Sequence, residues 1–253
     1  DEWKAAVKAN TKLLFLETPS NPLGEVADLE ALAELAHSIG ALLVVDNSLL
    51  SPVGSQPLKH GADISVSSAT KAIDGHGRVM GGVLAGSEEL MTQVAVYCNS
   101  CGLAMSPFNA WQLLSGVETL SLRLEKQFDN ALKIAQWLRT QPQVQAVYYT
   151  GLPDHPQAEL IRKQQNGGGI VVGFEVADTD AAWKVVDSVE LFSRTANLGD
   201  VRSTITHPWT TTHGRMQPEE KLAANIRPGL VRLSVGLEYV DDLIDDLKQA
   251  LAR

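Results

Sequence analysis

The stretch from Leu13 to Asn47, LLFLETPSNPLGEVADLEALAELAHSIGALLVVDN, decides the fold of this 253-residue chain. Its two short apolar runs, 13–16 and 41–45, are typical of parallel strands that are covered on both faces. Between them, Asp28 suits a helix N-cap and Gly40 suits the end of a helix. Apolar residues recur there at helical spacing, at Leu29, Leu32, Leu35, Ala36 and Ile39. The stretch therefore predicts a right-handed βαβ unit with both strand ends at one edge of a sheet.

Alternating strands and helices continue on both sides of a long helical region. Runs at 63–66 and 82–85 predict two further strands, and 108–138 predicts one long broken helix or two consecutive helices, with Gly116 as a candidate break. Later elements are expected as strands at 144–149, 170–176 and 230–235 and as helices at 157–165, 180–189 and 241–251. The sequence thus predicts a mostly parallel α/β large domain over 1–140 and a smaller α+β domain over 141–253.

Composition narrows the classes of partner. The net charge of −9 repels phosphate backbones and anionic lipid, so we expect neither nucleic acid nor a membrane surface as a partner. The apolar runs are too short for a spanning helix, and the first residues lack the pattern of a secretory signal. Together with only two cysteines, these features predict a cytoplasmic protein.

Polar residues follow the ends of three successive predicted strands. Asn21, Asp46 and Lys71 follow one another at intervals of 25 residues. Ligands of open α/β sheets bind beyond such strand ends. A partly desolvated lysine condenses with an aldehyde, and a carboxylate keeps a pyridine nitrogen protonated, which is the chemistry of pyridoxal phosphate. The hydroxyls of Ser68 and Thr70 suit its phosphate. Taken singly, Asp46 can equally be a turn residue and Lys71 a solvated lysine.

Six segments together resemble the Cys/Met-metabolism pyridoxal-phosphate enzymes, the trans-sulfuration family. They are LETPSNPLGEV, VVDNSLLSP, GADISVSSATKAIDGHG, SPFNAW, HPWTTTHG and GLVRLSVGLE. The resemblance runs from about residue 10 to the C-terminus and implies the fold of fold-type-I pyridoxal-phosphate transferases, with residues 1–140 as the distal part of the large, cofactor-binding domain. It also implies that the chain is the C-terminal part of a longer enzyme, with upstream phosphate-binding and ring-stacking residues outside it, and that the chain alone would hold the cofactor poorly.

The resemblance assigns cofactor contacts to five residues. Lys71 corresponds to the catalytic lysine that holds pyridoxal 5'-phosphate as a Schiff base and then transfers protons. Asp46 corresponds to the partner of the pyridine nitrogen, and Asn21 to the group beside the phenolic oxygen. Ser68 and Thr70 correspond to phosphate ligands. Two positions depart from the family pattern, since Ala72 replaces a usual aromatic residue and Ser67 a common histidine.

The resemblance also implies the reaction. Arg232 corresponds to the arginine that binds the substrate α-carboxylate, and Asn197 lies where a small polar residue is found near it. Segments around residues 75–82 and 195–208 are most similar to the O-succinylhomoserine sulfhydrylase branch, which uses sulfide to make homocysteine in methionine biosynthesis. There Arg78 is a candidate for binding the succinyl group, with a solvated surface arginine as the alternative.

Other activities remain open beside this one. Within the family, the alternatives are a cystathionine γ-synthase and a cystathionine or methionine γ-lyase. From another class, the alternative is a non-catalytic fragment or assembly module that keeps the fold. The resemblance further implies a homotetramer built from dimers that share active sites. Cys98 and Cys101 fit C-x-x-C but lack a second ligand pair, so no metal is expected.

Overall fold

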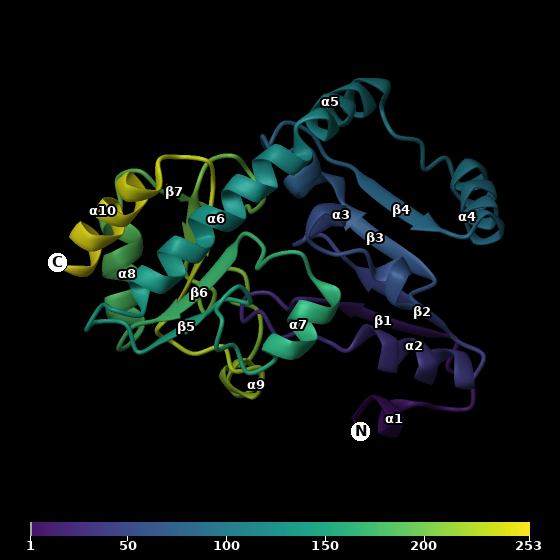
Figure 1. The fold of residues 1–253 in the computed structure, drawn as a ribbon, viewed down its shortest axis with the longest axis horizontal. Helices are drawn as coiled ribbons and strands as arrows, with labels where there is room; N and C mark the ends of the chain where they lie inside the picture. Colours follow the sequence, from purple (N-terminus) through teal and green to yellow (C-terminus); the bar gives the residue numbers. More distant parts are fainter. Residues whose placement is uncertain (1) are drawn as a thin grey trace.

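The computed structural model describes residues 2–253, which form two sheets with helices packed between and around them (Figure 1). The strands are β1 (Leu13–Glu17), β2 (Leu42–Asp46), β3 (Ile64–Ser68), β4 (Gly82–Gly86), β5 (Ala146–Tyr148), β6 (Val171–Glu175), β7 (Ser193–Arg194), β8 (Thr204–Thr206) and β9 (Leu230–Ser234). The helices are α1 (Glu2–Ala6), α2 (Leu29–Ser38), α3 (Ser51–Gly54), α4 (Glu88–Cys101), α5 (Pro107–Glu118), α6 (Leu120–Leu138), α7 (Ala158–Gln164), α8 (Thr179–Ser188), α9 (Pro218–Ala223) and α10 (Val240–Leu251). Two short turns of helix, η1 (Pro57–His60) and η2 (Ala69–Ile73), flank β3.

The first sheet has the order β1-β2-β3-β4, with three parallel strands followed by one antiparallel strand. The predicted βαβ unit is present. Asp28 caps α2 by accepting a hydrogen bond from the backbone N of Ala31 at 3.1 Å, and Gly40 follows the helix with a φ of +68°. Leu29, Leu43 and other apolar residues of α2, β1 and β2 form the buried core of this unit.

Strand β1 differs from the expectation that both faces are covered. Leu14 and Leu16 are buried against the core, but Leu13 and Phe15, which point to the opposite face, are 48% and 54% exposed. Alternate residues of a strand point to opposite faces, and α2 contacts the strand from one side. The prediction is therefore wrong for β1 within residues 2–253.

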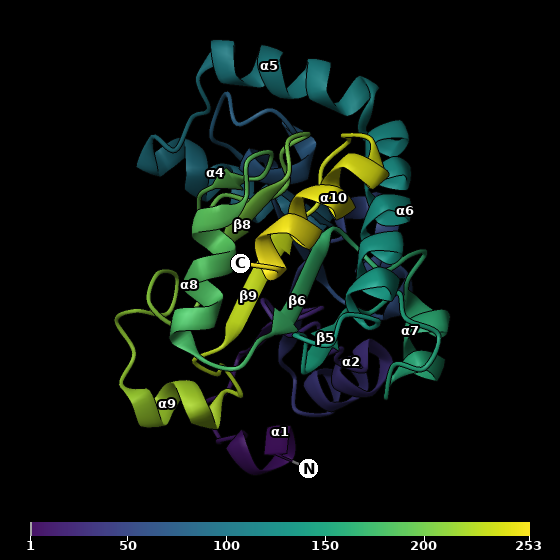
Figure 2. The ribbon, with the colours of Figure 1, turned by 90° about the vertical axis from the view of Figure 1, so that its left-hand side faces the viewer.

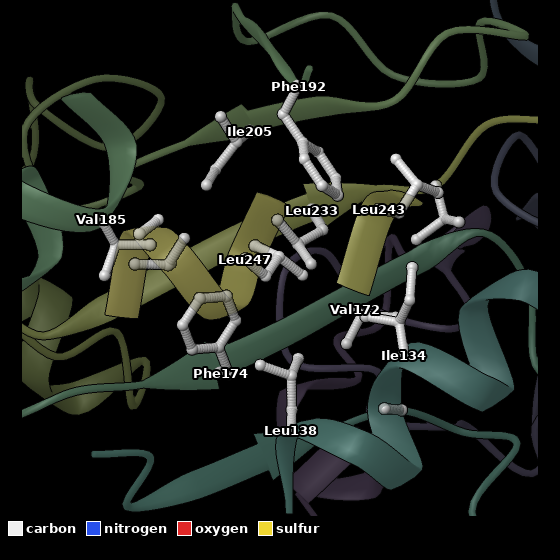
Figure 3. Close-up of a cluster of buried hydrophobic side chains, with 14 of the residues drawn as sticks. Ile134, Leu138, Val172, Phe174, Val185, Phe192, Ile205, Leu233, Leu243 and Leu247 are labelled. Carbon is white, nitrogen blue, oxygen red and sulfur yellow. The ribbon is translucent and has the colours of Figure 1, made fainter. Parts of the chain in front are cut away.

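The second sheet has the order β5-β6-β9-β8-β7, in which only the β8–β7 pair is parallel. Helices α6, α8 and α10 supply side chains that pack on it, including Leu138, Val185 and Leu247 (Figure 3). Phe174 and Leu233, from neighbouring strands, are both fully buried there. Fully burying such a side chain contributes roughly 1.5–3 kcal/mol, so this cluster stabilises the position of β9 in the core.

The part of the chain between β4 and β5 is helical, as expected, but the boundaries of its helices differ from the prediction. The break lies at Thr119, between α5 and α6, and not at Gly116. Gly116 instead packs closely against the backbone of η2, because a Cβ at this position would lie 2.3 Å from the carbonyl oxygen of Ile73. Helix α4 was not predicted, although Ser87 caps its start and Gly102 follows its end.

Helix α6 is in contact with elements of both halves of the molecule. It packs against α3 and η2 on one side and against β5, β6 and α10 on the other (Figures 1 and 2). The predicted domain boundary near residue 140 falls just after this helix ends at Leu138 and stays a prediction. No helix within residues 2–253 combines the length and apolar character needed to cross a membrane.

Candidate active site

The carboxyl ends of β1, β2 and β3 meet at one edge of the first sheet. Glu17, the last residue of β1, is opposite Asp46, the last residue of β2, and Asp46 is opposite Val66 of β3. The Asp46 Oδ1 atom accepts a hydrogen bond from the backbone N of Ser48 at 2.9 Å. The carboxylate that was predicted from the strand pattern therefore lies at the sheet edge where ligands of this class of fold bind.

Lys71 lies in η2, the turn that follows β3, and it interrupts that turn. Its backbone has a φ of −89° and a ψ of −124°, outside the helical region. Its Nζ donates to the side-chain Oδ1 of Asn197 at 3.4 Å. Burial lowers the pKa of the amine, and the nearby positive charge of Arg232 lowers it further. Both effects shift the amine toward its neutral form, which is the form that reacts with an aldehyde.

Arg232 reaches the same place from the middle of the second sheet. The residue is 2% exposed, its Nη1 donates to Asn21 Oδ1 at 3.2 Å, and its Nη2 donates to the backbone oxygen of Ala196 at 2.7 Å. Burial lowers its pKa to about 10, and the negative charge of Glu17 opposes this shift. Its Nε is buried without a hydrogen-bond partner among residues 2–253.

A continuous set of contacts joins four of the predicted site residues. Asn21 accepts from Arg232, the backbone next to Asn197 accepts from Arg232 as well, and the Asn197 side chain accepts from Lys71. The chain positions of these residues span 211 places, from Asn21 to Arg232. The fold thus brings Asn21, Lys71, Asn197 and Arg232 together, while their chemical roles stay predictions.

Ser68 and Thr70 flank the lysine as expected, and both are tied into the turn. The backbone N of Ser68 donates to Ser48 Oγ at 2.7 Å. The hydroxyl of Thr70 donates to the backbone oxygen of Gly81 at 3.3 Å and accepts from its N at 3.1 Å. These bonds tie the end of β3 to the loop after β2 and tie Thr70 of η2 to Gly81, just before β4. A phosphate contact of either hydroxyl stays a prediction.

Arg78 is held by an acidic residue that was not singled out in the sequence. Its Nε donates to Asp74 Oδ1 at 2.9 Å and its Nη2 to the backbone oxygen of Gln112 at 3.3 Å. The Asp74 side chain is fully buried, whereas that of Arg78 is 35% exposed. The arginine is therefore oriented by a buried carboxylate, with part of its guanidinium facing solvent.

Two residues of this region were missed by the sequence analysis, namely Glu17 beside Asp46 and Gly199 beside the lysine turn. Burial and the neighbouring charge of Asp46 raise the pKa of Glu17 to about 7, and Arg232 opposes the shift. Gly199 packs so closely on the lysine turn that a Cβ there would lie 2.6 Å from the N of Ala72. Glu17 ends an apolar run just as Asp46 does, so the same strand-end rule would have found it. Gly199 carries no comparable local signal, because its contact joins segments far apart in the chain.

The arrangement fits pyridoxal phosphate on its own chemistry. It offers an amine with a lowered pKa, a carboxylate at a strand end and a buried guanidinium with an unpartnered Nε. Asp46 Oδ1 is held by the backbone N–H of Ser48, and Oδ2 is the oxygen that would accept a hydrogen bond from a pyridinium N–H. Residues 2–253 hold no group of three or more histidine, cysteine, aspartate or glutamate side chains placed for a metal.

Comparisons with known proteins agree with this interpretation. The family of Cys/Met metabolism PLP-dependent enzymes matches residues 1–252. An O-succinylhomoserine sulfhydrylase of Pseudomonas aeruginosa is 53% identical over 99% of this chain and 62% of its own length. An L-methionine γ-lyase of Porphyromonas gingivalis is 42% identical over 99% of this chain and 64% of its own length. The structure of a cystathionine γ-lyase from Micromonospora echinospora aligns with a TM-score of 0.93 and 38% identity, over 96% of this chain and 64% of that one.

The fold and the lysine–carboxylate edge define a fold-type-I pyridoxal-phosphate enzyme, so the expected fold class and cofactor are confirmed. The match over residues 1–252 shows, more narrowly, that the chain belongs to the Cys/Met-metabolism PLP-dependent enzyme family. The chain spans less than two thirds of the length of the relatives named above. The relatives named above are a sulfhydrylase and two γ-lyases.

Proposed function

We propose that the protein replaces the succinyloxy group of O-succinylhomoserine with sulfide, giving homocysteine and succinate. The observation that supports this most is a pair of contacts at the sheet edge that carries Asp46. Lys71 donates to the Asn197 side chain, and Arg232 donates to the backbone oxygen of Ala196, the residue before Asn197. The 53% identity to an O-succinylhomoserine sulfhydrylase supports this substrate over the others in the family. In the overall reaction the γ-carbon loses a C–O bond to succinate and gains a C–S bond to sulfide.

In this proposal, residues of both sheets handle the substrate. Arg232 binds the α-carboxylate through its planar fork, and Asn21 holds one of its nitrogens in place. Lys71 removes the proton from the α-carbon and later returns protons, while Asn197 orients its Nζ. Asp46 would hold pyridoxal phosphate by its ring nitrogen, with Ser68 and Thr70 at its phosphate. The cofactor, when bound, supplies the electron sink that makes this proton acidic.

Arg78 is the proposed contact of the succinyl group. Its Nε is committed to the buried Asp74 and its Nη2 to the backbone oxygen of Gln112, so Nη1 is the nitrogen that would meet a carboxylate. We expect Arg78→Gln to raise KM for O-succinylhomoserine more than KM for O-acetylhomoserine, which lacks that carboxylate. An equal effect on both esters would leave Arg78 with a structural role only.

The decisive assay uses the complete polypeptide that carries this sequence. O-succinylhomoserine is offered with sulfide, with cysteine or with no thiol, and homocysteine, cystathionine and 2-oxobutanoate are measured. Homocysteine as the main product supports the proposal. Cystathionine would indicate a cystathionine γ-synthase, and 2-oxobutanoate would indicate a γ-lyase, which the 42% identity to an L-methionine γ-lyase keeps as the second candidate.

Cofactor attachment separates an enzyme from a non-catalytic module that keeps the fold. Borohydride should fix pyridoxal phosphate on the peptide containing Lys71, with loss of visible absorbance, and Lys71→Ala should abolish both. A complete polypeptide with no visible absorbance and no modified peptide would favour the non-catalytic module.

The proposal extends to assembly and compartment. It includes a cytoplasmic location and a homotetramer. The homotetramer accords with the apolar side chains exposed on α4, α5 and the start of α6, such as Val96, Trp111 and Leu122. The mass of the complete polypeptide in solution, measured by light scattering, tests the oligomeric state. A monomer would contradict it.

A further inference from the structure

Helix α6 carries a row of buried polar residues on one face. Arg123, Gln127 and Asn130 are 5%, 0% and 0% exposed, and their spacing of four and three residues aligns them along the helix. All three use their side-chain nitrogens to donate hydrogen bonds to backbone carbonyls outside the helix. We call these three residues the α6 polar row.

The first member of the row holds the lysine turn. Arg123 Nη1 donates to the oxygen of Ala72 at 2.8 Å and Nη2 to the oxygen of Ile73 at 3.2 Å. Ala72 directly follows Lys71. The turn is shaped to admit the guanidinium, because a Cβ on Gly75 would lie 2.0 Å from Arg123 Nη1. The conformation of the lysine turn therefore depends on this arginine.

The second member holds the other side of the site. Gln127 Nε2 donates to the oxygen of Asp200 at 3.0 Å and to the oxygen of Val235 at 2.8 Å. Asp200 directly follows Gly199, and Val235 directly follows β9, which carries Arg232. Asn130 continues this pattern one turn further on, with bonds of 3.0 Å to the oxygens of Gly236 and Glu238.

The segments held by the row meet at the lysine. Gly199 packs against the backbone of Lys71, where an added Cβ would come within 2.8 Å of the lysine carbonyl carbon. Asn197, two residues earlier, accepts the hydrogen bond from the amine. Helix α6 thus holds the lysine turn, η2 (Ala69–Ile73), through Arg123. Four residues later, Gln127 holds the loop that contains Asn197, Gly199 and Asp200, which we call the Asn197 loop.

We propose that Arg123 and Gln127 are positioning residues that set the distance between the Lys71 amine and the Asn197–Arg232 side of the active site. The inference rests on the proposed function of Lys71 and Arg232. A purely structural helix would pack here through apolar side chains, because burying donors costs free energy unless every one is bonded. The row instead gives its donors to carbonyls next to the reactive residues, and a small displacement between two reacting groups has a large effect on rate.

The test compares two variants of the same helix in the complete polypeptide. Gln127→Met keeps the length of the side chain and removes both donors, and Arg123→Lys keeps the charge and removes the fork. Gln136→Met is the matched control for Gln127→Met, since it makes the same change at an exposed position of the same helix. Ile134→Val is the matched control for lost stability, since Ile134 is fully buried and belongs to the core of the second sheet.

Three measurements are made on each variant, namely the thermal midpoint, the pH midpoint of the cofactor's visible absorbance, and KM and kcat. We expect Gln127→Met and Arg123→Lys to move the pH midpoint and to lower kcat/KM by roughly ten- to a hundred-fold. In cofactor-free Gln127→Met, amide exchange at Gly199 should also be faster than in the unchanged protein, because its N–H bond to Ser234 Oγ, 3.0 Å long, lies in the released loop. Ile134→Val should lower the thermal midpoint alone, and Gln136→Met should change nothing.

The outcomes separate the two proposals. Arg123→Lys and Gln127→Met variants that lose thermal stability but keep the original pH midpoint and KM would overturn the positioning role. An unchanged protein that borohydride does not label at Lys71 would refute the proposed function itself, before any variant is compared. Should Gln127→Met not fold, the Arg123→Lys result decides alone.

Discussion

Arg232 shows how much one buried side chain can contribute at the residue scale. Its two outer nitrogens hold Asn21 and the backbone of Ala196, at 3.2 and 2.7 Å, and its Nε remains unpartnered within residues 2–253. A lysine offers a single nitrogen and no planar fork, so the positive charge alone does not reproduce these contacts.

We therefore expect Arg232→Lys to raise KM for the amino-acid substrate by roughly ten- to a hundred-fold, since hydrogen bonds to charged groups contribute about 1.5–3 kcal/mol. Steady-state kinetics on the complete polypeptide measure this. The control is Arg139→Lys, which makes the same change in an exposed ion pair with Asp154. Equal KM values in the two variants would argue against carboxylate binding by Arg232.

Glu17 makes stability depend on pH. Its pKa in the folded chain is raised from 4.5 to about 7, mainly by burial and then by Asp46. The unfolded chain therefore loses this proton at a lower pH, so the stabilisation is complete below about pH 4.5 and is lost as the pH rises toward 7. Glu17 is exposed to solvent at the end of strand β1, and solvent therefore screens part of the effect. The remaining contribution to the free energy of unfolding is on the order of 1 kcal/mol.

Glu17→Gln should remove this dependence. Urea unfolding at pH 5 and pH 7.5 should show a smaller difference between the two pH values in the variant than in the unchanged protein. Glu125→Gln, a change at an exposed position of α6, is the control. A pH profile that is identical with and without Glu17 would contradict the assignment.

At the scale of elements, the contact between the Asn197 loop and the lysine turn depends on a residue without a side chain. Gly199 has a φ of +83°, and its Cα faces the backbone of Lys71 and Ala72. Gly40, after α2, has a similar φ of +68° but nothing within 4 Å of an added Cβ. Replacing either glycine would strain the backbone in the same way, but only at Gly199 would the added Cβ also collide with a neighbouring segment.

Gly40→Ala should lower the free energy of unfolding by about 1–2 kcal/mol, the cost of a left-handed conformation for a residue with a Cβ. Gly199→Ala should lower it by more and should also reduce the fraction of protein that borohydride labels at Lys71. Chemical denaturation and peptide mass measurement provide both values. Similar results for the two variants would mean that the loop adjusts without disturbing the lysine.

The elements also show what the sequence could predict. The βαβ unit, the strand-end positions of Asp46 and Lys71 and the helices near the C-terminus were predicted, because each has a local signal of periodicity or capping. The break at Thr119, the helix α4 and the short strands β7 and β8 were not. Gly116 was predicted as a helix break because it is a glycine within a helical pattern. Its close approach to Ile73 joins segments distant in the chain, which no local pattern records. Site residues carried by motifs were found, and the strand-end rule would also have found Glu17, whereas Gly199 required the fold.

At the scale of the whole molecule, the proposed ligand contacts come from both sheets, so cofactor binding should stabilise the two halves together. Free pyridoxal phosphate at about a hundred times its Kd should add about 2.7 kcal/mol and raise the unfolding midpoint by roughly 5–10 °C. Scanning calorimetry of the complete polypeptide, with the cofactor removed and restored, measures this. Lys71→Ala should show a smaller rise, and no rise in the unchanged protein would contradict the proposed site.

The order β1-β2-β3-β4 leaves a strand at each border of the first sheet within residues 2–253, and these strands carry Phe15 at 54% and Leu84 at 44% exposure. Unpaired backbone N–H and C=O groups beside apolar side chains favour self-association between molecules. Concentrated solutions of this polypeptide by itself should therefore scatter light and bind amyloid dyes over time. Phe15→Lys should delay that growth, because a charge on a border strand opposes the addition of another chain.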